Sequence, residues 1–144
     1  MAKPKPGEFR AARFESALPR LVLVVAELPQ TPACIVALVT NELEYATHRD
    51  VRIEESESGL RYPILVETDI TLPAWDKQLD EPIGKLVEGF DWLLRWLPDI
   101  CEAESHRIGL TLQGPWDSRW AWKERELNQA QRLSAACYRE LAGI

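Results

Sequence analysis

The sequence has few of the residues that build metal centres and disulfide frameworks. Its three cysteines, Cys34, Cys101 and Cys137, are far apart and form no CxxC motif, and its two histidines, His48 and His106, have no cluster of ligands around them. A structural zinc site needs four ligands at short spacings, and a disulfide framework needs paired cysteines. We therefore expect core thiols in a reducing compartment, with no metal and no other cofactor.

Long apolar runs are also missing. The longest run, Leu21 to Ala26, suits a buried strand and is far shorter than the roughly 20 residues that cross a bilayer. The first residues, MAKPKPG, carry positive charge, but no apolar segment follows them as it would in a signal peptide. These absences predict a soluble cytoplasmic protein with no membrane partner.

Positive charge is in short supply. The chain has 17 Lys and Arg against 23 Asp and Glu, a formal net charge of −6. Residues 1–25 carry five basic and two acidic side chains, whereas residues 26–91 carry five basic and fourteen acidic ones. Generic binding of nucleic acid depends on many Lys and Arg contacts to phosphate, so the composition excludes it. Any contact with RNA must be local, and we expect it near the basic residues 1–25.

Short strand-like segments make up the first two thirds of the chain. Apolar and β-branched runs, separated by turns rich in Pro, Gly and Ser, predict strands. The predicted strands are 7–14, 20–26, 33–40, 47–53, 62–68 and 83–86. Short strands at close intervals favour a small barrel or sandwich over βαβ units, and 144 residues suffice for one domain with a core.

The pattern becomes helical after residue 86. Residues 88–97 carry apolar side chains at helical spacing, and Pro98 ends the run. A further candidate strand covers 108–112, and Ser118 is the predicted N-cap of a long helix that continues through Leu141. The fold class is therefore α+β: an antiparallel β-barrel with its helix at 1–97, and a C-terminal helical extension at 98–144 packed on the same domain.

Several of these segments, in this order, resemble the MazF/PemK family of toxins. Residues 20–25 (RLVLVV) resemble the family's strand that opens with arginine, and 35–40 (IVALVT) resemble its strand that ends in threonine. Residues 58–70 and 83–86 (IGKL) resemble the valine-rich strand and the short strand that follow. The resemblance covers about residues 6–97. It implies an SH3-like barrel, a symmetric homodimer, and an endoribonuclease toxin that is neutralised by an antitoxin.

The resemblance also implies a mechanism and two catalytic residues. Members of the family cleave single-stranded RNA without a metal: the ribose 2′-hydroxyl attacks the neighbouring phosphate, leaving a cyclic phosphate and a free 5′-hydroxyl. By position, Arg20 would stabilise the developing charge and protonate the leaving oxygen, and Thr40 would orient the phosphate. A guanidinium matches phosphate well. Arg20 begins one strand and Thr40 ends the next, so antiparallel pairing would bring them to the same sheet edge.

Four more residues are candidate substrate contacts. Glu15 and Ser16 lie in the loop before Arg20, His48 belongs to the Thr47-His48 step before Val51, which resembles the family, and Asp69 stands where the family has glutamine. The sequence departs from the family in three ways: the loop is shorter and lacks a glycine and a glutamine, Leu21 replaces proline, and Asp69 replaces glutamine. The tail from about Pro98 to Ile144 has no counterpart in the minimal family domain.

Two alternative functions stay open. The same barrel with a degraded site would bind protein or nucleic acid without cutting it. A protein similar to the CcdB toxins, which share this barrel, would poison gyrase through its C-terminal residues. Trp116, Trp120 and Trp122 are able to stack on bases, although such a cluster more often docks a helix on a barrel.

Overall fold

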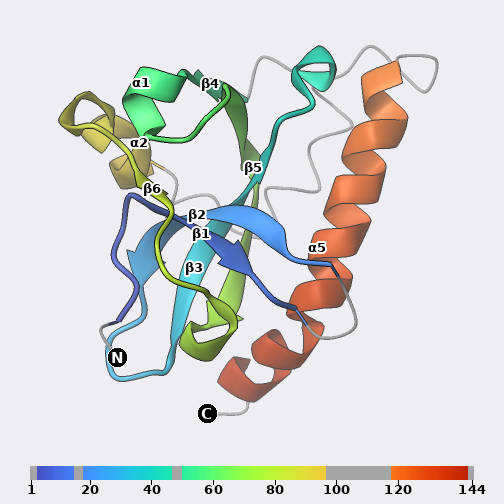
Figure 1. The fold of residues 1–144 in the computed structure, drawn as a ribbon. Coiled ribbons are helices and arrows are strands. Elements are labelled where there is room, and N and C mark those ends of the chain that lie inside the picture. Colours follow the sequence, from blue (N-terminus) through green and yellow to red (C-terminus); the bar gives the residue numbers. More distant parts are fainter. Residues whose placement is uncertain (1–2, 15–17, 47–49, 97–117, 143–144) are drawn as a thin grey trace.

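One antiparallel sheet of six strands forms the centre of the protein (Figure 1). The computed structural model describes residues 3–14, 18–46, 50–96 and 118–142. The strand order is β4-β5-β3-β2-β1-β6. The strands are β1 (Glu8–Ala12), β2 (Arg20–Glu27), β3 (Ala33–Thr40), β4 (Val51–Ile53), β5 (Ile64–Trp75) and β6 (Gly84–Lys85). The helices are α1 (Glu55–Ser58), α2 (Asp91–Trp96) and α5 (Ser118–Ala142), with 3-10 turns η1 (Leu43–Tyr45), η2 (Asp76–Gln78) and η3 (Glu88–Phe90).

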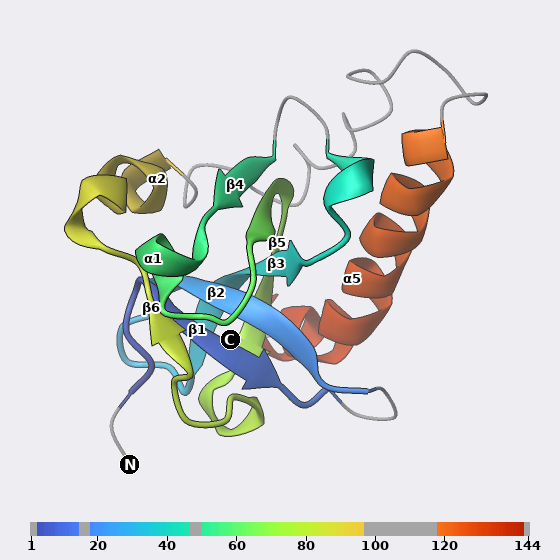
Figure 2. The same ribbon diagram turned by 45° about the horizontal axis from the view of Figure 1, so that its top comes forward.

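Both faces of the sheet are covered, because alternate strand residues point to opposite sides. On β2, Val22 and Val24 belong to one apolar cluster, which includes Ala130 of α5. Leu23 and Val25 belong to a second cluster, which includes Leu93 of α2. Figures 1 and 2 show α5 along one side of the curled sheet, with α2 away from it. None of the described helices is long and apolar enough to span a bilayer.

The sheet curls because its ladders are interrupted. The β2–β3 register shifts between Val24 and Ala26, and the β3–β5 register shifts on either side of Leu38, where residues 67–70 of β5 form a bulge. Such bulges bend a strand and re-aim its side chains. The strands β4 and β6 are the two edges of the sheet. Helix α1 follows β4 in the chain and contacts β6, so it links the two edges. The result is a curled half-barrel with helices, which confirms the predicted α+β class.

The sequence prediction was wrong about the length of one strand and about one turn. The strand predicted at 62–68 continues to Trp75 through Pro73. Proline is tolerated there because β4 pairs only with Ile64 to Val66, so among the described residues this half of β5 pairs with β3 alone. The segment between the predicted strands 47–53 and 62–68, which was expected to be a turn, contains the short helix α1, and Gly59 ends this helix with a φ of 77°.

The remaining elements agree with the prediction more closely. Of the strand predicted at 47–53 the structure describes β4, and residues 47–49 lie outside the described part. Residues 88–96 form η3 followed by α2, and α5 matches the predicted long helix within one residue at each end. The candidate strand at 108–112 lies outside the described residues.

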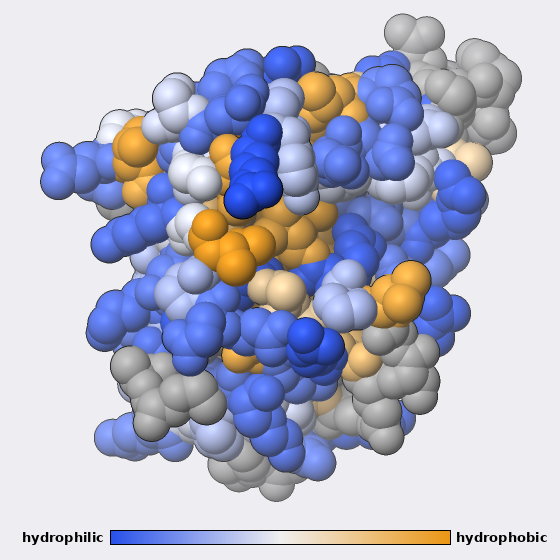
Figure 3. Space-filling view, viewed as in Figure 1, coloured by the Kyte–Doolittle hydropathy of each residue, from blue (hydrophilic) through white to orange (hydrophobic). Residues whose placement is uncertain are grey.

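The face of the molecule that is seen in Figure 1 carries mostly hydrophilic residues (Figure 3). Figure 3 shows apolar side chains gathered near its centre, over β1, β2 and β6. The large apolar residues Ile83 and Val87, which flank β6, are exposed. Cys34 and Cys137 are buried free thiols, as predicted, and burial raises the pKa of Cys34 to about 12. Cys101 lies outside the described residues.

Candidate active site

Arg20 and Thr40 lie at matching ends of neighbouring strands. Arg20 is the first residue of β2 and Thr40 is the last residue of β3. The antiparallel register pairs Val22 with Leu38, and extending it by two residues sets Arg20 across from Thr40. Val22 and Leu38 both pack on the side of α5, so strand alternation directs Arg20 and Thr40 to that side as well.

Both residues line one pocket. Its volume is about 300 Å³, at the lower end of the range of roughly 300–1,000 Å³ that is typical of ligand sites. The polar and aromatic residues around it are Arg20, Thr40, Asn41, Glu42, Tyr62, Trp122 and Glu126. Thr40 is mostly buried, and its hydroxyl oxygen accepts a hydrogen bond of 3.1 Å from the Glu42 N–H. The Thr40 O–H is therefore available as a donor to a bound group.

The Arg20 guanidinium is held by α5. Its Nη1 and Nη2 donate to the two carboxylate oxygens of Glu126 at 3.1 and 2.8 Å, and Nη1 also donates to Gln129 Oε1. This end-on, bidentate pairing fixes the orientation of the guanidinium plane. Sequence reasoning did not find this contact, because 106 residues separate Arg20 from Glu126 along the chain.

A buried charge cluster continues from Glu126 into the protein. Lys123 Nζ donates to Asp50 Oδ1 at 2.8 Å and to Glu67 Oε1 at 2.9 Å, and all three side chains are almost fully buried. Glu67 comes from the β5 bulge, and its Oε2 is buried with no donor among the described residues. Asp50, Lys123, Glu67, Glu126 and Arg20 thus form one chain of charged groups between the sheet and α5.

The pKa values of the two glutamates in this cluster are shifted in opposite directions. Burial raises the pKa of Glu67 well above its usual range, and its hydrogen bond with Glu126 adds to the increase. Burial alone would raise the pKa of Glu126 too, but the hydrogen bond from Glu67 and the Arg20 guanidinium outweigh it and lower that pKa. With Glu67 protonated, the two cations of the cluster are balanced by the carboxylates of Asp50 and Glu126.

The structure does not describe the side chains of the other four predicted substrate contacts. Glu15, Ser16 and His48 lie outside the described residues. Asp69 is in the β5 bulge, and its side chain is also outside what the structure describes.

One of the three tryptophans docks α5, as the residue pattern suggested. Trp122 stacks on Tyr45 with 4.7 Å between ring centroids, and the Arg125 guanidinium lies 5.7 Å from the Trp122 ring. Both contacts leave little ring surface for a base. Trp116 and the Trp120 side chain are outside the described part of the chain.

The buried face of α5 is not wholly apolar. Ala130 and Cys137 are buried on it, and Lys123, Glu126 and Ser134 are buried beside them. Residues 123, 126 and 130 follow helical spacing, so charged side chains occupy the sheet-facing stripe. On the sheet the matching signal was Glu67, which directly follows the apolar run 63–66.

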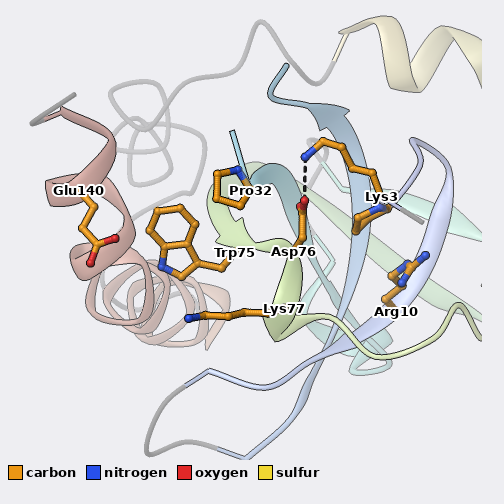
Figure 4. A pocket seen from close by; sticks show the side chains of 8 residues that line it. Lys3, Arg10, Pro32, Trp75, Asp76, Lys77 and Glu140 are labelled. Atoms are coloured by element: carbon orange, nitrogen blue, oxygen red, sulfur yellow. Dashed lines mark hydrogen bonds and ion pairs between the residues drawn. The ribbon is translucent and has the colours of Figure 1, made fainter. Parts of the chain in front are cut away.

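A larger pocket of about 500 Å³ lies at the opposite end of β3 and β5 (Figure 4). Its lining includes Lys3, Arg10, Pro32, Trp75, Asp76 and Glu140. Lys3 pairs with Asp76 at 2.9 Å and donates to two backbone carbonyls, and Arg10 pairs with Glu8. Because this pocket lies at the opposite end of β3 from Thr40, and away from the start of β2 where Arg20 lies, we place the site in the smaller pocket.

Comparison with known proteins identifies the fold. No family model and no curated protein matches the sequence. Among solved structures, the chain is similar to the Mycobacterium tuberculosis toxin MazF-mt6, at 21% identity and a TM-score of 0.50, over 76% of this chain and 99% of that one. It is also similar to an endoribonuclease in complex with its cognate antitoxin from a mycobacterial species, at 15% identity and a TM-score of 0.49, over 81% and 99%. The likeness to MazF-mt6 confirms the predicted resemblance in fold: this chain has a MazF-like half-barrel with a C-terminal helix.

Proposed function

We propose that this protein is a metal-independent endoribonuclease toxin that cleaves single-stranded RNA and is neutralised by an antitoxin. The observation that carries the proposal is the pocket in which Arg20 and Thr40 meet, at the strand ends that the MazF/PemK resemblance assigns to catalysis. The MazF-like fold supports it.

RNA cleavage by the 2′-hydroxyl requires only two contributions from the protein. The substrate supplies its own nucleophile, so the pocket must orient the 2′-oxygen in line with the phosphate and stabilise the charge on the phosphorane oxygens. Arg20 donates to a phosphate oxygen and stays charged at any working pH. The Thr40 hydroxyl donates to a second phosphate oxygen. Tyr62, which is 47% exposed at the pocket, offers a ring on which a splayed base stacks.

The direct test is cleavage of a long single-stranded RNA in excess chelator. We expect the wild-type protein to cut, and Arg20→Ala to lower kcat/KM by about 100-fold or more, because a positioned charge donor to the transition state is lost. Arg52→Ala is the matched control: Arg52 is an exposed arginine on β4, paired with Glu54 at 2.8 Å, and its loss should leave the rate unchanged. Thermal unfolding of each variant checks that it is folded.

Each alternative function predicts a different result. Intact RNA at high protein concentration would contradict the proposal and favour a binding module built on the same barrel. Growth arrest with uncut RNA and accumulated DNA breaks would contradict it in favour of a gyrase poison. The homodimer implied by the resemblance stays a prediction, which a light-scattering mass of two chains in solution would confirm.

A further inference from the structure

We propose that Glu126 of α5 is the proton acceptor for the attacking 2′-hydroxyl, held in place by Arg20 and Glu67. This inference rests on the proposed ribonuclease function and adds a catalytic residue that lies outside the segments resembling MazF/PemK. Glu126 lines the same pocket as Arg20 and Thr40, and it is the carboxylate in direct contact with the Arg20 guanidinium.

Arg20 keeps one binding edge for a phosphate. A guanidinium has five N–H donors. Glu126 and Gln129 together accept three of them, two from Nη1 and one from Nη2. The Nε–H and the second Nη2–H, which form the side-on edge, have no acceptor among the described residues. A phosphate bound to that edge lies beside the Glu126 carboxylate, because both are in the plane of one guanidinium.

Glu126 keeps one acceptor position as well. An ionised carboxylate has about four lone-pair positions. Two accept the Arg20 hydrogen bonds, and another faces the buried Glu67 side chain, which helps to lower the pKa of Glu126. The remaining position has no donor among the described residues, and because Glu126 lines the pocket, it is within reach of a bound ribose.

The surrounding charges keep Glu126 ionised. Arg20 of β2 and Glu67 of β5 face it from the sheet, and Lys123 and Gln129 are near it on its own helix. Arg20 and the Glu67 hydrogen bond lower the pKa of Glu126, so the acceptor is deprotonated at neutral pH. Glu67 and Gln129 are positioning residues, since they touch Glu126 or Arg20 rather than the reacting atoms.

The proposed reaction moves one proton from the 2′-hydroxyl to Glu126 and exchanges one phosphorus–oxygen bond for another. The 2′-O–H bond breaks, its proton passes to Glu126, and the 2′-oxygen forms a bond to phosphorus. The bond from phosphorus to the 5′-oxygen then breaks with its electron pair on oxygen, and that oxygen takes a proton from a water molecule. The hydroxide left behind removes the proton from Glu126, which restores the carboxylate. The products are a 2′,3′-cyclic phosphate and a 5′-hydroxyl.

The test is the pH dependence of RNA cleavage in excess chelator for wild type, Glu126→Gln and the control Glu140→Gln. Glu140 is an exposed glutamate on the same helix. Between about pH 5 and 7 we expect a flat wild-type rate, because the acceptor is already ionised. We expect Glu126→Gln to lose about 100-fold or more, and its remaining rate to rise about tenfold per pH unit as hydroxide takes over the role of base. Glu140→Gln should behave as wild type.

The outcomes separate this inference from the proposed function. A wild-type protein that does not cut RNA refutes the ribonuclease proposal, and the inference with it. An active wild type with a Glu126→Gln variant within a few-fold of it, and the same flat profile, refutes the inference alone. A faster Glu126→Gln variant also refutes it, since Glu126 would then only mask Arg20. If Glu126→Gln does not fold, a wild-type rate that itself rises tenfold per pH unit overturns the inference.

Discussion

Lys123 is the most deeply buried cation among the described residues, with 1% of its side chain exposed between Asp50 and Glu67. Removing one partner of such a cluster leaves an uncompensated charge in the interior. We expect Lys123→Met to lower the free energy of unfolding by about 3–5 kcal/mol. Lys85→Met, at an exposed position of β6, should change it by less than about 0.5 kcal/mol. Urea unfolding followed by tryptophan fluorescence measures both, and equal effects would show that the cluster does not hold α5 on the sheet.

Glu67 should make the free energy of unfolding decrease as the pH rises. Its folded pKa is raised, so the folded state keeps a proton that the unfolded chain loses above about pH 4.5. The contribution of Glu67 to the free energy of unfolding is therefore complete below that pH. As the pH rises toward the folded pKa, this contribution falls by up to about 1.4 kcal/mol per pH unit. Glu126, with its lowered pKa, acts oppositely and only below about pH 4.5.

Glu67→Gln isolates this contribution, because glutamine is similar in shape to the neutral acid and does not titrate. Urea unfolding at several values between about pH 5 and 8 should show wild type losing stability relative to Glu67→Gln as pH rises. Other titrating groups are common to both proteins and cancel in the difference. Parallel stability profiles would mean that Glu67 is ionised in the folded protein.

At the scale of elements, α5 is fixed to the sheet by a small apolar contact as well as by charge. Ala130 is 4% exposed in the cluster that contains Val22 and Leu38. We expect Ala130→Asp to lower the free energy of unfolding by at least about 3 kcal/mol, because it buries an unpaired carboxylate. Ala121→Asp makes the same change at an exposed position near the start of α5 and should cost at most about 1 kcal/mol. Similar losses in both variants would place α5 away from the core.

Strands with simple patterns could be predicted, and elements fixed by distant contacts could not. The strands β2 and β3 were predicted almost to the residue, because continuous β-branched runs end at clear turn signals. The extension of β5 through Pro73 depends on its pairing with β3, which continues after the pairing with β4 ends at Val66, and local sequence does not reveal this.

The same limit holds for the site. The meeting of Arg20 and Thr40 follows from antiparallel pairing of consecutive strands, so the sequence alone predicted it. The Glu126 carboxylate reaches Arg20 only through the packing of α5, and its burial on a helix stripe contradicts the usual preference of charged residues for solvent.

At the scale of the whole molecule, the basic N-terminal stretch is largely neutralised within the fold. Lys3 pairs with Asp76, Lys5 with Glu27, Arg10 with Glu8 and Arg13 with Asp80. Within residues 1–25 we therefore expect the RNA contact at Arg20, whose side-on edge has no acceptor among the described residues. A contact confined to this pocket should neutralise one or two phosphates.

Salt dependence measures that number. For single strands the slope of log affinity against log salt is about −0.7 per phosphate neutralised. We expect a slope no steeper than about −1.4 for a fluorescent single-stranded DNA, which lacks the 2′-hydroxyl and is not cut. Fluorescence anisotropy at several salt concentrations gives the slope. A slope of about −3 or steeper would reveal an extended basic surface elsewhere on the molecule.

We propose that the pocket of Arg20 and Thr40 directs a ribose 2′-hydroxyl onto its own phosphate, and the ends of the RNA fragments record this step. Mass spectrometry of fragments produced in excess chelator identifies those ends. We expect 2′,3′-cyclic phosphate and 5′-hydroxyl ends from wild type, and none from Arg20→Ala. Fragments with 5′-phosphate ends, or the same fragments from both proteins, would contradict it.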